Sequence, residues 1–331
     1  MRPAVIAPAS AIMAATALLA LGTHAQTPPV FEGSPEGISS IRAESSLGRS
    51  AAWSEESMRS AQPAPLPTAD PDAVRAAFRS RGFSGHVLGG QTEDGPAPAG
   101  LGRQSGDVHS FPLSMVGRLF FNEDGDAPGV AHSCTAQFVD QNVILTASHC
   151  VQDDKPPFAY HKNFAFALQY DRRTMRHVYH WGCLGNPKGW AQESAARYLY
   201  DYAMIQTDTP SDVGWFGLQW NWVGMYNRAT KVGYSSGSLA GEVVQVDAGP
   251  LTVSDGLVEL KHGNKNVQHG SSGGGYVGDY STVFHGKENH IISSESFSRG
   301  KDGETSGIGY GPYYTDGLQS LLNYVKNGCK S

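Results

Sequence analysis

The sequence has no dense stripe of lysine and arginine. Its 25 basic residues stand against 31 acidic ones, which gives a formal net charge of −6. A protein that binds nucleic acid needs a basic surface to meet the phosphates, so this class is disfavoured. We expect no nucleic-acid partner, and the mild acidity indicates nothing further about what the protein binds.

The sequence also lacks an apolar run long enough to cross a bilayer, which takes about 20 residues. The apolar run at residues 11–21 follows the positive charge of Arg2 and is followed by the small residue Ala25. These are the parts of a secretory signal peptide. The sequence therefore predicts a signal peptide over residues 1–25, no membrane anchor, and a protein secreted to the extracellular space or the periplasm.

Known metal-binding patterns are missing too. The stretch from His177 to Cys183 contains two histidines and a cysteine, but it has no His-Glu-x-x-His pattern and no clear fourth ligand. The acidic stretch at residues 122–126 misses the spacing of an EF-hand and is interpreted as a solvated turn. A metal site at residues 177–183 stays as a minor alternative, and we expect neither a metal nor another cofactor.

Cysteine is scarce. The four cysteines are Cys134, Cys150, Cys183 and Cys329. In an exported protein cysteines tend to pair, because the compartment is oxidising. Four cysteines allow three connectivities, and their spacing alone does not choose among them.

Residues 26 to about 105 are rich in Ser, Ala, Pro and Gly and have few large apolar residues. The run at residues 62–67 is expected to be extended, because proline fixes φ and disfavours helix. A short helix is predicted after it, with Asp70 as its cap and Pro71 in its first turn. Its apolar face would consist of Val74, Ala77 and Phe78. We interpret residues 26–105 as a pro-segment and linker that acts in cis; a disordered tail is the alternative.

The pattern changes from about residue 111. Short apolar strands separated by Gly, Asn and Asp clusters recur there, which is typical of an all-β barrel or sandwich. They are expected at residues 115–121, 136–139, 142–146, 164–169, 202–206, 242–247, 257–261 and 290–293. One amphipathic helix closes the chain, because apolar residues recur at helical spacing there. These residues are Leu318, Leu321, Leu322 and Val325.

Three local patterns contain residues that can do chemistry. In the first, a strand ends in small residues and presents His149, whose imidazole can take up and return a proton near neutrality. In the second, Asp201 precedes an apolar strand and could orient an imidazole. In the third, glycines flank Ser272, so that a tight turn could expose it as a nucleophile. Taken singly, a structural histidine, an ordinary aspartate at a strand start and a flexible Gly/Ser loop are the simpler interpretations.

Together these patterns resemble those of the chymotrypsin-like (trypsin-like) serine peptidases. Leu-Thr-Ala-Ser-His-Cys resembles the family's Leu-Thr-Ala-Ala-His-Cys, and Asp-Tyr-Ala-Met resembles its Asp-[Ile/Tyr/Phe]-Ala-[Leu/Met]. Gly-Ser-Ser-Gly-Gly resembles its Gly-Asp-Ser-Gly-Gly. The segment at residues 116–120 is similar to the start of the bacterial glutamyl-endopeptidase branch. The chain order His, Asp, Ser also matches the chymotrypsin arrangement.

The resemblance implies an all-β fold over residues 106–331, with two six-stranded β-barrels and a C-terminal α-helix. It implies a catalytic triad in the cleft between the barrels: Ser272 as nucleophile, His149 as general base and then acid, and Asp201 as orienter. The backbone N–H groups of Gly270 and Ser272 would form the oxyanion hole. The implied function is a secreted serine endopeptidase that cleaves protein or peptide substrates through an acyl-enzyme.

The resemblance further implies a Cys134–Cys150 disulfide, after which Cys183 and Cys329 are expected to pair. It places the primary specificity pocket at Asn266, Ser293 and Glu295. Asn266 is not the Asp that selects basic side chains, and the wall strand lacks the histidine of glutamyl endopeptidases. Strict preference for Glu is therefore not expected, and Glu295 would attract a basic side chain if it faced the pocket.

One position departs from the family. Trypsin-like zymogens have an Asp before the nucleophile, which pairs with a newly freed N-terminal amine; here Ser271 stands there, and a hydroxyl cannot compensate a buried ammonium. The usual Ile-Val-Gly-Gly start is also missing, and the nearest segment, residues 115–117, is expected inside a strand. We expect the oxyanion loop to be ordered without N-terminal insertion. The pro-segment would cover the cleft or aid folding, and be removed within residues 102–106.

Other functions remain open with the same residues. A catalytically inactive homologue would act as a binding protein, although it has kept all three triad residue types. An esterase could use the same triad. The Gly-x-Ser-x-Gly elbow of α/β-hydrolases is set aside, because only His285 and His290 follow Ser272 and no helix–strand alternation surrounds them.

Overall fold

The computed structural model describes residues 37–43, 53–81, 104–123, 130–237, 239–286, 288–300 and 305–330. The predicted signal peptide lies outside these residues, as does most of the acidic stretch at residues 122–126. In the described part of the chain, no helix combines the length and the apolar character that a membrane span requires.

The first sheet contains a closed barrel. Its strands are β1 (Ile38–Arg42), β2 (Gln62–Pro63), β5 (Val116–Asn122), β6 (His132–Asp140), β7 (Val143–Thr146), β8 (Lys162–Leu168), β9 (His177–Pro187) and β10 (Ala203–Thr207). They follow the order β1-β9-β10-β7-β6-β5-β8, and a further pairing of β8 with β9 closes six of them. Aromatic and branched side chains such as Phe138, Phe166 and Leu184 fill the interior, as a small barrel requires.

The second sheet follows the order β11-β16-β15-β12-β13-β14-β18, and β4 pairs with β13. Its strands are β4 (Gln104–Ser105), β11 (Gly217–Leu218), β12 (Arg228–Gly233), β13 (Gln245–Ser254), β14 (Leu257–Leu260), β15 (Gly275–Gly278), β16 (His290–Ser294) and β18 (Gly309–Pro312). The fold prediction is confirmed. The second sheet differs from the prediction in one detail. The two-residue strand β11 pairs in parallel with β16, so the path through the second sheet has seven strands and not six.

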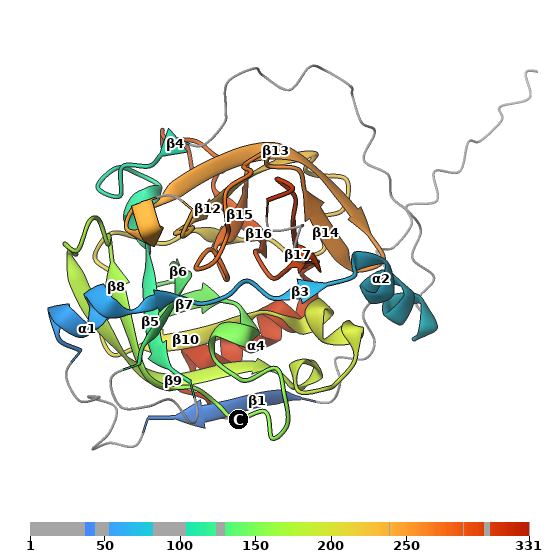
Figure 1. Ribbon diagram of the computed structural model, residues 1–331, viewed down its shortest axis with the longest axis horizontal. Helices are drawn as coiled ribbons and strands as arrows, with labels where there is room; N and C mark the ends of the chain where they lie inside the picture. Colours follow the sequence, from blue (N-terminus) through green and yellow to red (C-terminus); the bar gives the residue numbers. More distant parts are fainter. Residues whose placement is uncertain are drawn as a thin grey trace, which may run out of the picture.

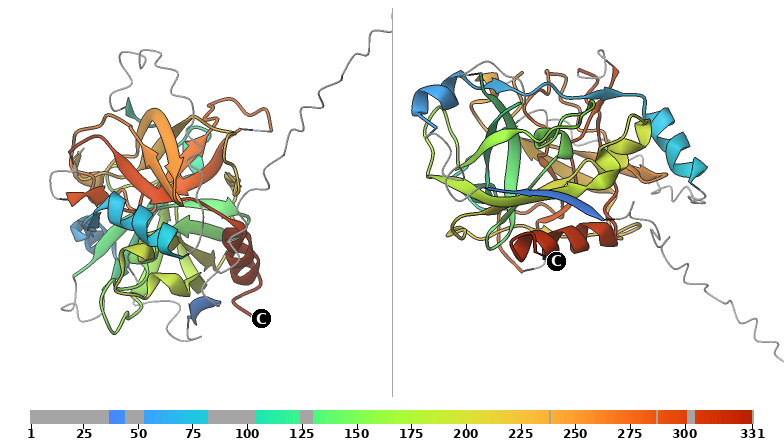
Figure 2. Two further views of the ribbon diagram at one scale, coloured as in Figure 1. Left: turned by 90° about the vertical axis from the view of Figure 1, so that its right-hand side faces the viewer. Right: turned by 90° about the horizontal axis from the view of Figure 1, so that it is seen from below.

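Three α-helices are described: α1 (Glu55–Ser60), α2 (Pro71–Ser80) and α4 (Asp316–Lys326). The predicted helix after the proline run is confirmed as α2. The Asp70 side chain accepts a hydrogen bond from the Asp72 N–H, and Val74 and Phe78 are buried. The predicted C-terminal helix is α4, which buries its apolar face. The right-hand view of Figure 2 shows α1 and α2 at opposite ends of the molecule and α4 beside β1.

Both expected disulfides are present. Cys134–Cys150 joins β6 to the turn that carries His149, and Cys183–Cys329 holds the residues after α4 onto β9. Because the Cys183 sulfur is used in a disulfide, the minor alternative of a metal site at residues 177–183 loses its thiolate ligand.

The described parts of residues 26–105 pack on the two sheets and do not extend away as a tail. β1 pairs antiparallel with β9, and β2 pairs in parallel with β6. The short strand β3 (Thr68–Ala69) pairs in parallel with β17 (Ser298–Arg299). Figure 1 shows the chain from α1 through β3 to α2 running across the front of the molecule, between the two sheets. This segment therefore bridges the two halves of the fold.

Candidate active site

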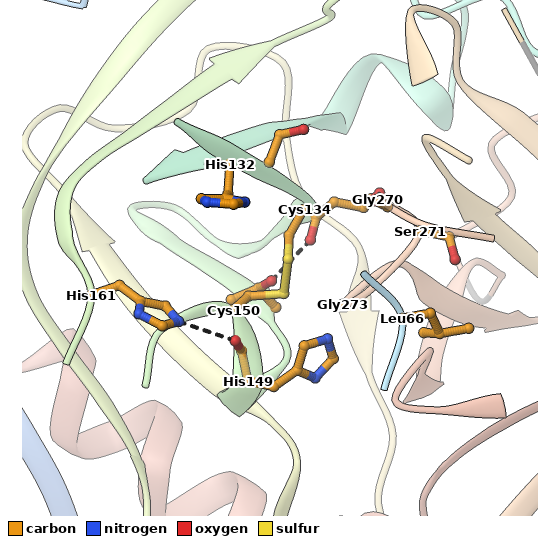
Figure 3. The surroundings of a disulfide bond; sticks show 12 residues. Leu66, His132, Cys134, His149, Cys150, His161, Gly270, Ser271 and Gly273 are labelled. Atoms are coloured by element: carbon orange, nitrogen blue, oxygen red, sulfur yellow. Dashed lines mark hydrogen bonds between the residues drawn. A yellow bond between two sulfur atoms is a disulfide. The ribbon is translucent and has the colours of Figure 1, made fainter. Parts of the chain in front are cut away.

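Local hydrogen bonds and a disulfide fix His149 in place. It lies in a 3-10 turn, Ser148–Cys150, that directly follows β7. The Ser148 hydroxyl lies 2.9 Å from the carbonyl oxygens of both Tyr200 and Tyr202, the two neighbours of Asp201. Figure 3 shows His149 beside the Cys134–Cys150 disulfide and Gly270 near Cys134. The turn that carries the imidazole is thus pinned both to β6 and to the segment that carries the carboxylate.

Asp201 is fully buried and makes three hydrogen bonds to groups in the described part of the chain. Its Oδ2 lies 2.8 Å from Nδ1 of His149 and also accepts from the Ser296 hydroxyl, while its Oδ1 accepts from the His149 backbone N–H at 3.0 Å. A buried carboxylate is tolerated only with such partners. Because Nδ1 must donate to this carboxylate, a neutral imidazole has its free lone pair on Nε2. The pair can therefore act as an oriented base.

The Ser272 loop is held by backbone hydrogen bonds from both sheets. The Thr135 N–H donates to the Ser272 carbonyl at 2.9 Å, and the Gly273 N–H donates to the Glu295 carbonyl at 2.8 Å. Gly273 has φ +77°, and a Cβ there would lie 2.3 Å from Oγ1 of Thr146. Only glycine fits this close approach, which explains the glycine after the serine.

Ser272 and His149 are not hydrogen-bonded to each other. Within the described residues, neither Oγ of Ser272 nor Nε2 of His149 has a hydrogen-bond partner, and both atoms are buried. Hydrogen bonds between catalytic groups often form only in the substrate complex. In this form of the chain, the Asp201–His149 half of the predicted triad is assembled and the Ser272–His149 half is not.

The predicted oxyanion groups differ in what they bind. The Gly270 N–H, at a residue with φ +82°, donates to the carbonyl oxygen of Ala64 at 2.9 Å. The Ser272 N–H has no backbone acceptor within the described residues. The Ser271 hydroxyl donates to the Gln268 carbonyl at 2.7 Å, so it braces the loop from within. This bracing is compatible with an oxyanion loop ordered without an inserted N-terminus. Of residues 115–117, which were predicted inside a strand, Val116 and Gly117 lie in β5, whereas Met115 ends the 3-10 turn before it.

The three predicted specificity residues are engaged with protein partners. The side-chain amide of Asn266 donates to Oδ1 of Asn264 at 2.8 Å, and the Ser293 hydroxyl donates to the Pro312 carbonyl at 2.9 Å. Glu295 is fully buried, and its carboxylate is bound as well. Within the described residues, the Asn266 amide nitrogen, the Ser293 hydroxyl and the Glu295 carboxylate are thus all engaged by protein groups.

Sequence reasoning missed the partner of Glu295. Nζ of Lys231, in β12, lies 3.1 Å from Oε1 of Glu295 and 2.8 Å from Oε1 of Gln268. The Tyr276 hydroxyl donates to the other carboxylate oxygen, and burial followed by the Glu295 charge raises the pKa of Tyr276 well above its usual value. The ion pair cancels the negative charge that would have attracted a basic substrate side chain.

The buried His262 lies near Lys231, and its environment should make the stability of the protein depend on pH. Burial, and then the charge of Lys231, hold the pKa of His262 well below its ordinary value. The unfolded chain therefore takes up a proton at about pH 6.5 that the folded chain resists, so stability is lost as pH falls below that value. We expect the Tm of the wild type to fall more between pH 7 and pH 5 than the Tm of His262→Gln.

The exposed His177 supplies the matched control, because His177→Gln should keep the wild-type pH dependence. Thermal unfolding followed by circular dichroism at both pH values measures the slopes. Equal slopes for wild type and His262→Gln would contradict the assignment.

Comparison with known proteins settles the fold. No protein-family model and no curated protein sequence matches the chain. Solved structures do match. The protease Anisep from Arthrobacter nicotinovorans matches with a TM-score of 0.55 and 23% identity, over 67% of this chain and 98% of that one. A Glu endopeptidase matches with a TM-score of 0.55 and 19% identity, over 68% of this chain and 97% of that one. HL collagenase matches with a TM-score of 0.51, 15% identity and coverage of 66% and 95%. The chain has the fold of the chymotrypsin-like serine proteases. At these identities the likeness shows the fold, and about a third of this chain has no counterpart in the three structures.

Proposed function

We propose that the protein is a secreted serine endopeptidase that acts through an acyl-enzyme. The observation that carries the proposal is the buried Asp201–His149 hydrogen bond, which leaves Nε2 of His149 as a base in a fold shared with proteases. The glycine-rich loop brings Ser272 to the same region, since its carbonyl is bonded to β6 next to Cys134. The two disulfides are compatible with an extracellular protein.

In the proposed reaction, Nε2 of His149 accepts the Ser272 proton as Oγ attacks the substrate carbonyl carbon. The N–H groups of Gly270 and Ser272 stabilise the oxygen that becomes negative. The imidazolium, stabilised by Asp201, gives its proton to the leaving amine, and the acyl group stays on Ser272. A water molecule, deprotonated by His149, then hydrolyses the ester and restores the enzyme. No metal or cofactor takes part in this scheme.

One observation favours a second candidate, a catalytically inactive homologue that binds a protein. Ser272 is fully buried and makes no hydrogen bond to His149 in the described structure. A permanent arrangement of this kind would leave the serine unreactive. An esterase that uses the same residues differs from the proposed function only in its substrate, and parallel assays with peptide and ester substrates separate the two.

Labelling by an organophosphonate tests the proposal. The secreted protein from which residues up to 102–106 have been removed is treated with a serine-directed fluorophosphonate and mapped by mass spectrometry. We expect one adduct, on the peptide that contains Ser272, together with loss of peptide hydrolysis. A processed protein that takes up no label and hydrolyses no peptide would support the inactive homologue instead.

A further inference from the structure

The segment Gln62–Pro67, which we call the strap, crosses the candidate active site. At its start the Gln62 N–H donates to the Ala131 carbonyl at 2.8 Å, next to β6. At its end the Pro67 carbonyl accepts from the Ser298 N–H at 2.9 Å, in β17. Between these ends, the Ala64 carbonyl accepts from Gly270. The strap therefore passes from one sheet to the other over the predicted oxyanion hole.

The alternating prolines of the strap fit this path. The N–H groups of its even-numbered residues all bond to the peptidase body: Gln62 to Ala131, Ala64 to Ser133 and Leu66 to Nδ1 of His269. In an extended chain the odd-numbered N–H groups point the other way. Prolines, which have no N–H, occupy these positions at 63, 65 and 67. Ala64 and Leu66 are buried, whereas Pro65 is exposed.

The carbonyl bound at Gly270 belongs to the Ala64–Pro65 bond. The nitrogen of this bond is the backbone nitrogen of Pro65, which carries the ring carbon Cδ in place of a hydrogen. Cδ crowds this nitrogen, which an imidazolium would have to protonate for the bond to break. A peptide bond can thus place its carbonyl in the oxyanion hole and still fail to lose its amine. Proline also reduces the freedom that the strap loses on binding.

The strap is held at both ends by ordered elements. Beyond it, Arg75 and Arg79 of α2 pair with Glu259 at 3.0 Å and with Asp255 at 2.6 Å. Before it, Met58 of α1 is buried in the core. These anchors keep the strap at a high effective concentration over the site.

We propose that the strap is a built-in, cleavage-resistant inhibitor of this site, which deepens and rests on the proposed endopeptidase function. It occupies the oxyanion position beside the buried Ser272 with a peptide carbonyl. It resists turnover because the bond it presents is followed by Pro65. The class of molecule that the site accepts in this manner is an extended peptide with proline at alternate positions.

The first experiment loosens the strap in the full chain. Leu66→Asp puts a charge at a buried position, so it should displace the strap and raise the rate of fluorophosphonate labelling at Ser272 about tenfold or more. Thr68→Asp adds the same charge two residues further on, where the side chain is exposed, and should label as slowly as the wild type. The rates are measured on intact full-length protein by mass spectrometry.

The outcomes separate the strap from the function beneath it. If processed wild type labels rapidly but full-length Leu66→Asp stays as slow as full-length wild type, the strap is not the inhibitor, and the peptidase proposal stands. If neither protein labels, the proposed function fails and the inference fails with it. Rapid labelling of full-length wild type would also contradict the proposal that the strap inhibits the site.

The second experiment tests the role of proline and does not disturb the core, since Pro65 is exposed. Pro65→Ala should make the strap a substrate, with new termini after residue 64. The same substitution in a Ser272→Ala background should stay intact, which excludes a contaminating protease. Pro67→Ala is the matched control, because the Leu66 carbonyl before it is not bonded to Gly270. A Pro65→Ala chain that is not cut between residues 64 and 65 would overturn the cleavage-resistance argument.

Discussion

Replacing Ser272 by alanine is expected to lower kcat/KM for peptide hydrolysis by about 10⁶-fold, the scale of losing the nucleophile of a triad. The fold should be kept, because the hydroxyl has no hydrogen-bond partner within the described residues and its removal strands no buried group. The processed forms of wild type and variant are compared with the same peptide substrate, and Tm is measured alongside.

Two further variants sharpen this result. His149→Ala combined with Ser272→Ala should be no worse than Ser272→Ala alone, since the two residues act as one unit. The neighbouring Ser271→Ala removes a hydroxyl that only braces the loop through the Gln268 carbonyl, so it should keep measurable turnover. Normal turnover by Ser272→Ala would refute the proposed nucleophile.

Asp201→Asn should lower kcat/KM by about 10⁴-fold, as the loss of the orienting carboxylate does in such triads. The amide can donate to Nδ1 of His149, which shifts the imidazole proton to Nε2 and removes the base. The loss should lie in kcat at every pH tested, because the tautomer and not the charge state has changed.

Ser296→Ala is the matched control for this prediction. It removes one of the three hydrogen bonds to Asp201 but leaves the carboxylate and its bond to His149. A loss of about tenfold is expected, the scale of one hydrogen bond. If Asp201→Asn retained a rate within tenfold of wild type, Asp201 would not be the orienting residue.

Much of the fold and of the site follows from local sequence. The helix α2 was predictable because Asp70 and Pro71 form a cap and a first turn by short-range chemistry. The Asp201–His149 contact was predictable from the resemblance, and so was the Cys134–Cys150 disulfide. These features depend on residue type at fixed spacing.

Other features depend on how distant segments meet. The extended shape of residues 62–67 follows from proline, but nothing in that run indicates that β6 and β17 are its neighbours. Lys231 and Glu295 lie in different segments of the second sheet, so their pairing was not predictable from either strand. Ser296 was missed for the same reason, although a serine just past a strand end near the site is a signal that could have been examined.

If the strap inhibits the site as proposed, its attachment through α2 divides activation into two steps. A cut within residues 102–106 lies beyond α2, so it leaves the strap joined to α2 and α2 joined to the second sheet through Arg75 and Arg79. After the cut, the segment that contains the strap and α2 is held only by non-covalent contacts, as a bound ligand is. Its departure follows mass action, favoured by dilution and by salt, which screens partly exposed ion pairs. The cut protein would therefore stay inhibited at high concentration and become active on dilution.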